Sequence, residues 1–161
     1  MKKFAELITR LDQSNKTGDK LEALGSFFKT ASPEDQIWGI AIFSHRRPKR
    51  QVNTRQLRIW CQETAGIPDW LFEECYQSVG DLAETIALLL PPAKTSQQKT
   101  LSEWITELKS LEKLEEDAKK NFILSAWDSL DPTERFVFNK LITGGFRIGV
   151  SQSLIIQALS K

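Results

Sequence analysis

The stretch DPTERFVFNKLITGGFRIGVSQ, Asp131–Gln152, carries the signals for two helices and the turn between them. Asp131 followed by Pro132 is a typical helix start, because aspartate accepts hydrogen bonds from free backbone N–H groups and proline fits the first turn. The apolar residues that follow recur at helical spacing, and the glycine pair 144–145 ends the pattern. A second helix is expected after Ser151, because serine is a good N-cap. This stretch therefore predicts helical structure.

Similar signals along the rest of the chain predict an all-α fold, a compact domain of about ten short helices. No stretch alternates apolar and polar residues as a strand does, and the sequence has no hairpin signal. The expected helices span 2–13, 19–30, 54–66, 68–80, 82–90, 131–144 and 151–159, with others beginning at 33 and 100 and one containing 122–127. For the helix that begins at 33, we expect a buried side formed by Ile37, Trp38, Ile40 and Ala41.

Composition and length favour one globular domain over residues 1–161. The chain has 161 residues and is 40% hydrophobic, which is enough to bury a core. Its five tryptophans and nine phenylalanines are expected to pack in this core rather than to stack on bases. The pair Pro91–Pro92 and the polar residues after it indicate an internal linker, 91–99, between halves of about 1–90 and 100–161.

Several function classes are disfavoured by the same composition. The longest apolar run, 86–90, is too short to span a bilayer, and the N-terminus has no signal-peptide core, so we expect a cytoplasmic protein with no membrane association. Cys61 and Cys75 lack metal-site spacing and are expected to be small buried residues in a reducing compartment. With His45 as the single histidine, no metal site is expected.

Charge is strongly segregated along the chain, although the net charge is only +1. Six cations and no acid lie between Asp35 and Glu63, whereas residues 59–93 hold six acids and no lysine or arginine. After Glu134 only cations remain. This pattern predicts a basic surface behind a neutral average, and a polyanion is the expected partner.

A first candidate phosphate-binding segment is the basic loop 46–50. Four cations, Arg46, Arg47, Lys49 and Arg50, surround Pro48, which does not continue a helix, so the charges are expected to project from a loop towards phosphates. An alternative remains open, in which this turn improves solubility and pairs with the acidic stretch 63–84.

The second candidate is the glycine-rich connection before the last helix. Glycine allows close approach of the backbone to a phosphate, and a helix N-terminus offers free N–H groups. The residues expected to contact one run of phosphates are Gly144, Gly145, Phe146, Arg147, Gly149, Ser151 and Gln152. A purely structural alternative, a glycine C-cap followed by a serine N-cap, also fits this pattern.

The third candidate repeats this arrangement in the first half. Gly80 separates two expected helices, and we expect Gly80 with its neighbour Asp81 to approach a second run of phosphates. The Asp81 side chain itself is expected to cap its helix rather than to touch DNA. Two such junctions would contact two stretches of the nucleic-acid backbone without base-specific contacts.

No catalytic motif is present, and no catalytic residue is predicted. The chain lacks GxxxxGK[ST], GxSxG and HExxH, and the acids Asp69, Glu73 and Glu74 recur at the spacing of a solvated helix face.

Two other function classes stay open. A helical protein–protein interaction module would bind a partner protein without DNA, and a small independent enzyme would need a composite site that the sequence does not reveal.

One family resemblance covers essentially the whole chain. Residues 139–152 closely resemble the end of the N-terminal DNA-binding domain of ATP-dependent DNA ligases. Further stretches resemble the bacterial branch of that family in the same order, namely 4–7 with 11–12 and 16, 46–50, 66–68 with 71–74, and 79–86. The resemblance implies an all-helical domain that binds nicked duplex DNA through the minor groove and backbone, without sequence specificity.

The same resemblance implies a larger enzyme that seals nicks in replication, repair or recombination. Ligases of this family attach AMP to the lysine of a Lys-x-Asp-Gly motif, and no lysine here begins that motif. We therefore expect these residues to be inactive alone and to bind no cofactor, with ATP and Mg²⁺ belonging to the full-length ligase. The expected partners are nicked DNA and the ligase's own nucleotidyltransferase and OB-fold domains. A monomer associated with the bacterial nucleoid is expected.

Overall fold

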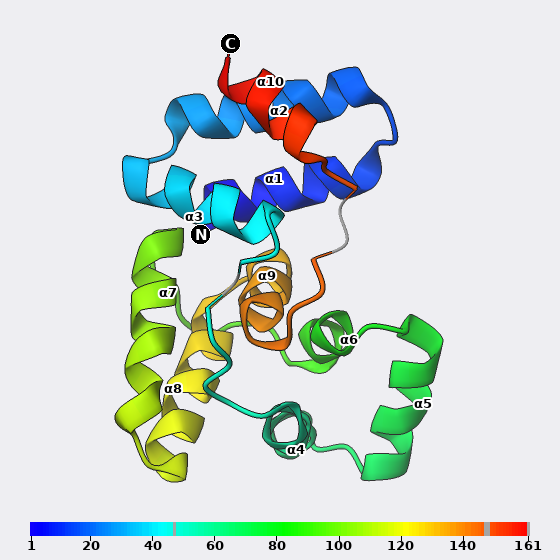
Figure 1. Cartoon of the computed structure of the whole chain (residues 1–161). Helices are drawn as coiled ribbons and strands as arrows, with labels where there is room; N and C mark the ends of the chain where they lie inside the picture. The colour runs from blue at the N-terminus through cyan, green and yellow to red at the C-terminus, as the bar shows by residue number, and fades with distance from the viewer. Residues whose placement is uncertain (47, 147–148, 161) are drawn as a thin grey trace.

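The computed structural model describes residues 1–46, 48–146 and 149–160. Within these residues the chain forms ten α-helices and one short 3-10 helix, with no strand, which confirms the predicted all-α fold (Figure 1). The α-helices are α1 (Lys2–Gln13), α2 (Thr17–Thr30), α3 (Pro33–Phe43), α4 (Thr54–Ala65), α5 (Asp69–Val79), α6 (Leu82–Leu89), α7 (Leu101–Ser110), α8 (Glu116–Ser129), α9 (Pro132–Thr143) and α10 (Gln152–Leu159), and η1 spans Leu111–Lys113.

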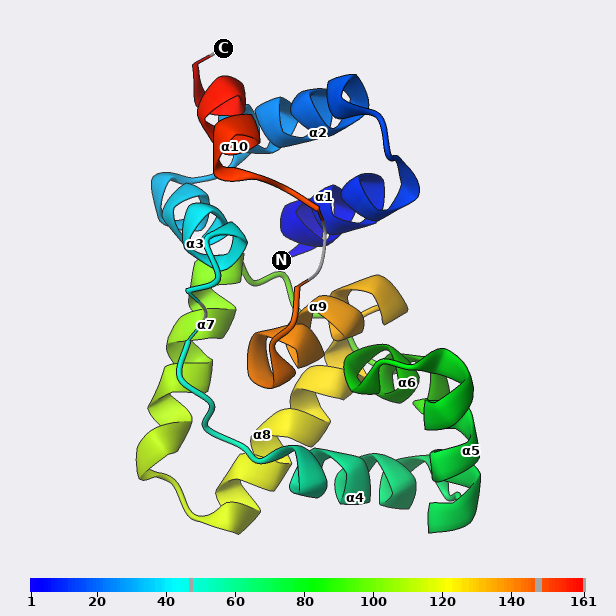
Figure 2. The same ribbon diagram turned by 45° about the vertical axis from the view of Figure 1, so that its right-hand side comes forward.

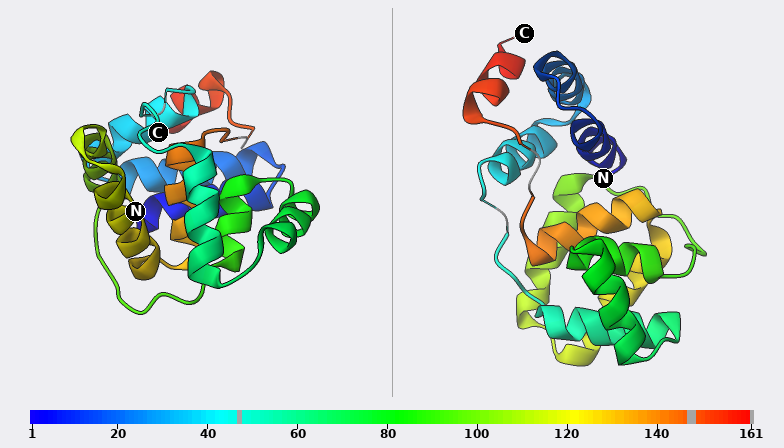
Figure 3. Two further views of the ribbon diagram at one scale, coloured as in Figure 1. Left: turned by 90° about the horizontal axis from the view of Figure 1, so that it is seen from below. Right: turned by 90° about the vertical axis from the view of Figure 1, so that its right-hand side faces the viewer.

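The helices form two groups, which are visible one above the other in Figure 2. One group holds α1, α2, α3 and α10, and the other holds α4 to α9 (Figure 3, right). Helix α9 packs against both α6 and α1, and α10 packs against α2. The C-terminal part of the chain therefore returns onto both groups, so that helices from residues 1–90 and from 100–161 share their packing surfaces.

Local signals account for where most helices begin. Side-chain oxygens of the N-cap residues accept a backbone N–H from the first turn at Ser32, Asn53, Asp81, Thr100, Asp131 and Ser151. At Thr100 and Asp131 the third helical residue is a glutamate that completes a capping box. These caps satisfy N–H groups that the helix itself leaves free.

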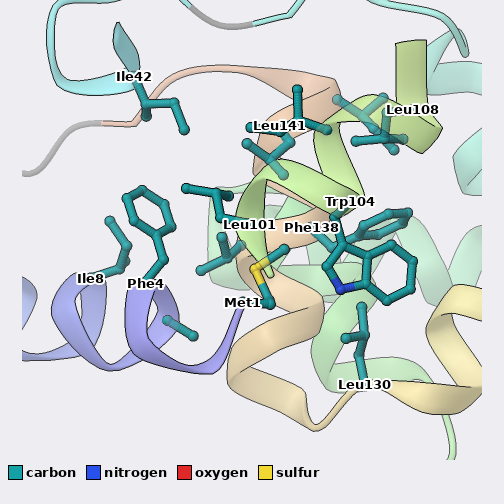
Figure 4. Close-up of a cluster of buried hydrophobic side chains, with 14 of the residues drawn as sticks. Met1, Phe4, Ile8, Ile42, Leu101, Trp104, Leu108, Leu130, Phe138 and Leu141 are labelled. Atoms are coloured by element: carbon teal, nitrogen blue, oxygen red, sulfur yellow. The ribbon is translucent and has the colours of Figure 1, made fainter. Parts of the chain in front are cut away.

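One hydrophobic core runs through both groups, and Figure 4 shows part of it, including the rings of Phe4, Trp104 and Phe138. Trp104 of α7 packs edge-on against Phe138 of α9, with ring centroids 5.4 Å apart. Phe4 of α1 similarly meets Phe27 of α2 at 5.7 Å. Burial of each large side chain stabilises the fold by about 2–3 kcal/mol. Trp70 departs from the expected core role, because it is 66% exposed on α5.

The predicted buried side of α3 is partly wrong. Trp38 and Ile40 are half-buried and pack against the core as expected, and Ala41 is half-buried, but Ile37 is 66% exposed. The most deeply buried residues of α3 are Asp35, Gly39, Ile42 and Phe43. Gly39 faces the ring of Phe27 so closely that an added Cβ would lie 2.9 Å from it. Asp35 accepts the backbone N–H of Ser102 at 2.9 Å. These two contacts orient α3 with its glycine side inwards.

Candidate nucleic-acid interface

The three candidate segments meet at one groove, although they are far apart in sequence. The groove has a volume of about 850 Å³. Helices α1, α5, α6 and α9 contribute to its walls. The candidate residues that line it are Arg50, Gly80, Asp81, Gly144, Gly145 and Phe146. The structure therefore brings Arg50 and both glycine junctions together in one concave surface. The other described candidate residues do not line it, namely Arg46, Lys49, Gly149, Ser151 and Gln152.

Lys140 joins the two glycine junctions. It lies in the last turn of α9, and its side chain is only 9% exposed. Its Nζ forms an ion pair with the carboxylate of Asp81. The same ammonium donates to the carbonyl oxygen of Gly145 at 3.2 Å and, more weakly, to that of Gly144 at 3.5 Å. The start of α6 and the end of α9 are thereby held next to each other.

Sequence reasoning missed this role of Lys140. The position of a lysine in the last turn of a helix was visible, and a cation is favourable there because the free carbonyls carry partial negative charge. Its burial and its partner were not visible, since Asp81 lies 59 residues earlier in the chain.

Arg50 supports the end of α9 from the other side. Its Nε donates to the carbonyl oxygen of Ile142 at 3.3 Å, and its Nη2 donates to that of Thr143 at 3.1 Å. Arg50 and Lys140 together therefore bind four consecutive carbonyls at this helix end. A guanidinium has five N–H groups, so two hydrogen bonds leave Arg50 with donors for a phosphate.

The rest of the basic loop is exposed on the surface. Arg46 and Lys49 are exposed and have no ion-pair partner within residues 1–46, 48–146 and 149–160. Pro48 is buried and anchors the loop. The nearby Lys119 donates to the carbonyl oxygen of Gln51 at 3.0 Å, which ties this segment to α8. Arg47 lies outside the described residues.

The acidic stretch 63–84 finds its partners elsewhere. Arg58 pairs with Asp69 and Glu73 at 3.0 and 2.7 Å, and Lys120 pairs with Glu63 at 2.8 Å. Within the described part of the chain, no ion pair joins this stretch to Arg46, Lys49 or Arg50. The structure thus gives no support to the alternative in which the basic turn neutralises the acids.

The segment before α10 contains the N-cap of that helix and is contacted by a lysine of α2. Ser151 accepts the N–H of Leu154 at 3.2 Å, so the serine N-cap is present, and Gln152 begins the helix on an exposed surface. Gly149 has a φ of 61°, and its carbonyl oxygen accepts a hydrogen bond from Lys20 of α2 at 3.2 Å. Lys20 was not predicted. Arg147 lies outside the described residues.

Phe146 has a packing role in this region. The residue is half-buried, and its ring meets that of Phe4 edge-on at 6.4 Å between centroids. The glycine pair before it is thereby anchored to α1. Gly144 is buried and Gly145 exposed, so Gly145 is the one of the pair that a phosphate can approach.

Cys61 is fully buried and does not line the groove. Burial raises the pKa of the Cys61 thiol to about 12, so this thiol stays protonated at neutral pH and is a poor nucleophile. No group of three or more His, Cys, Asp or Glu is placed to hold a metal among the residues that the structure describes. None of the described helices is both long enough and apolar enough to cross a bilayer.

Comparison with known proteins assigns the chain to a family. The family model described as DNA ligase N terminus matches residues 1–160. The sequence matches none of the curated proteins compared with it. The family model spans nearly all of the chain, and the all-α fold agrees with this match. The chain is a member of the DNA ligase N-terminal family.

Proposed function

We propose that this chain binds duplex DNA without reading its sequence and holds a nick in place for an ATP-dependent DNA ligase. Membership of the ligase N-terminal family implies a DNA-binding role within such an enzyme. The observation that carries the proposal further is the convergence of Arg50, Gly80 and Gly145 on one groove. Convergence of independently predicted phosphate-binding segments is the arrangement expected of one continuous DNA-binding surface.

Each part of the surface has a distinct task in this proposal. The exposed cations Arg46, Lys49 and Arg50 attract the phosphates, and Lys20 adds a charge beside Gly149. The glycines allow the backbone to come close to the sugar–phosphate chain. Contacts of this kind position a duplex and carry no sequence information. Binding is therefore expected to depend on the shape and charge of DNA.

We assign ATP and Mg²⁺ to the full-length ligase. The sequence has no Lys-x-Asp-Gly motif, and the described residues hold no cluster of metal ligands. No step of nick sealing is assigned to them. Their contribution is positional, because a tethered nucleotidyltransferase domain finds a bound nick at high effective concentration. We also propose that the chain acts as a monomer in the bacterial cytoplasm, next to the ligase's own OB-fold domain, in replication, repair or recombination.

Fluorescence anisotropy over a salt series tests the proposal. The chain is titrated against nicked duplex, intact duplex and single strand of one base sequence, and against a duplex of a second sequence. We expect duplex binding that weakens steeply with salt and changes little with sequence. Absence of duplex binding at low salt would contradict the proposal and favour the protein–protein interaction module.

Charge reversal tests the basic loop within the same assay. The double variant Arg46→Glu/Lys49→Glu is expected to flatten the slope of log affinity against log salt by about 2, because two phosphate contacts are lost. The matched control is Lys94→Glu/Lys113→Glu, which changes the net charge equally at exposed positions outside both the basic loop and the groove. Equal effects of the two double variants would show general charge attraction rather than a defined contact.

Arg147 stays a prediction from the sequence. Arg147→Ala is expected to lower duplex affinity by about 1–3 kcal/mol, the range for a charge-assisted hydrogen bond. Unchanged affinity in a folded variant would remove Arg147 from the DNA-binding surface.

A further inference from the structure

The ammonium of Lys140 lies in the groove yet has no proton to offer a phosphate. Its three N–H groups face three acceptors, namely the carboxylate of Asp81 and the carbonyl oxygens of Gly144 and Gly145. Its side chain is 9% exposed. A direct DNA contact through Lys140 would require one of these bonds to break. Its role must therefore be explained through the groups that it holds.

Asp81 has a partner on each carboxylate oxygen. Oδ1 accepts the backbone N–H of Glu84 at 2.9 Å and so caps α6, directly after Gly80. Oδ2 accepts from Lys140 at the end of α9. One carboxylate thus fixes the beginning of α6 relative to the glycine pair 144–145. In addition, Lys140 neutralises a negative charge that would otherwise repel phosphates at the groove.

We propose that the Lys140–Asp81 ion pair is a positioning element that sets the separation of the two glycine junctions, so that both engage one duplex at the same time. The inference rests on the proposed DNA-binding function. Simultaneous engagement of two contact sites strengthens binding far beyond either site alone, and this gain is lost when the geometry prevents both from engaging.

Asp81→Asn distinguishes positioning from simple electrostatics, because the two explanations predict changes of opposite sign in duplex affinity. Asparagine is as good an N-cap as aspartate, so the cap of α6 is kept. The substitution removes a negative charge from a phosphate-binding surface, so electrostatics alone predicts tighter binding. Positioning predicts the opposite, because the link to Lys140 is lost. We expect duplex affinity to fall about tenfold and the salt slope to flatten.

The double variant Asp81→Asn/Lys140→Met provides a second, charge-neutral test. It removes one charge of each sign, so the net charge equals that of the wild type, and methionine keeps much of the volume of the lysine stem. Simple electrostatics predicts unchanged affinity, whereas positioning predicts a loss of about tenfold and no further loss relative to Lys140→Met alone. This variant decides the question if Asp81→Asn leaves a buried, unpaired Lys140 and fails to fold.

Two control variants separate positioning from general effects on charge or stability. Glu107→Gln breaks the pair between Glu107 and Lys99, which are 2.7 Å apart, and makes the same charge change outside the groove. Ile123→Val removes a methyl group from the buried face of α8 and lowers stability without touching either junction. Both are expected to keep the wild-type salt slope, since no phosphate contact is lost.

Anisotropy with nicked duplex, on variants shown to be folded by circular dichroism, is the deciding experiment. Weaker binding and a flatter salt slope for Asp81→Asn or for the charge-neutral double variant support the inference. Wild-type binding together with equal or tighter binding by both variants overturns it and leaves the proposed function intact. Failure of the wild type to bind any duplex would instead overturn the proposed function.

Discussion

The junctions after α5 and after α9 share a local design but differ in their surroundings. Each helix ends at a glycine with positive φ, 82° at Gly80 and 83° at Gly144. Each glycine N–H donates to the carbonyl four residues earlier, Tyr76 at 2.7 Å and Lys140 at 2.8 Å. The two helix ends therefore agree in φ and in this hydrogen bond.

They diverge in the next dihedral angle. Gly80 has a ψ of 1°, which turns the chain directly into the cap of α6 at Asp81. Gly144 has a ψ of −173°, which extends the chain away from α9 towards the other helix group. Gly80 is exposed with open space around it, whereas Gly144 is buried between the cations that hold the end of α9. Similar local signals thus lead to a tight turn into the next helix after α5. After α9 they lead to an extended connection that runs to the other helix group.

The largest expected effect tests this difference directly. Gly144→Ala places a side chain at φ 83° and ψ −173°, a region that only glycine occupies readily, inside a buried environment. We expect a loss of about 3 kcal/mol in the free energy of unfolding, measured by urea denaturation. A loss no larger than that of Gly80→Ala would remove the distinction between the two junctions.

Arg50→Lys tests the support that only the second junction receives. The substitution keeps the charge but removes the planar fork that donates to the carbonyls of Ile142 and Thr143. We expect a loss of about 1.5 kcal/mol in stability by urea denaturation, with the salt dependence of DNA binding nearly unchanged. Arg50→Met is the matched variant that removes the charge as well. If Arg50→Lys is as stable as the wild type, the end of α9 does not depend on this fork.

Gly80→Ala measures the less constrained junction. A residue other than glycine at φ 82° and ψ 1° adopts the left-handed conformation, at a cost of about 1 kcal/mol. No heavy atom lies within 4 Å of the added Cβ, so no steric term is expected. Thermal denaturation by circular dichroism measures the change, and Gly80→Asn is the control because asparagine tolerates this conformation. A cost well above 1 kcal/mol would contradict this expectation, because it would mean that a side chain at position 80 meets a steric obstacle.

The smallest effect concerns a third helix end that uses the same conformation without glycine. His45 follows α3 with a φ of 63°, and the next N–H, that of Arg46, donates to the carbonyl of Ala41 at 2.7 Å. This is the hydrogen-bond pattern that normally selects glycine. His45→Gly is therefore expected to stabilise the fold by about 0.5 kcal/mol, after the greater flexibility of glycine in the unfolded chain is subtracted. A destabilised His45→Gly variant would show that the imidazole makes a contribution of its own.

Local structure was predictable because its causes lie within a few residues. The capping boxes at Thr100 and Asp131, the glycine ends at 66 and 80 and the serine N-cap at 151 all depend on side chains next to the backbone that they serve. Each of the three predicted phosphate-binding segments also contributes at least one residue to the groove. Sequence reasoning partly misjudged α3, because Gly39 faces inwards to meet Phe27, a partner outside its own helix.

By itself the sequence determined the all-α class, the approximate positions of the helices, many of their ends and the segregation of charge, since each depends on residue type and short-range spacing. Only the tertiary structure decided that α9 packs against helices of both groups and that Lys140 of α9 meets Asp81. It also decided that Arg50 completes the end of a helix 92 residues later. Hydrogen bonds over such separations depend on how whole helices pack, and no local pattern of residues specifies that packing.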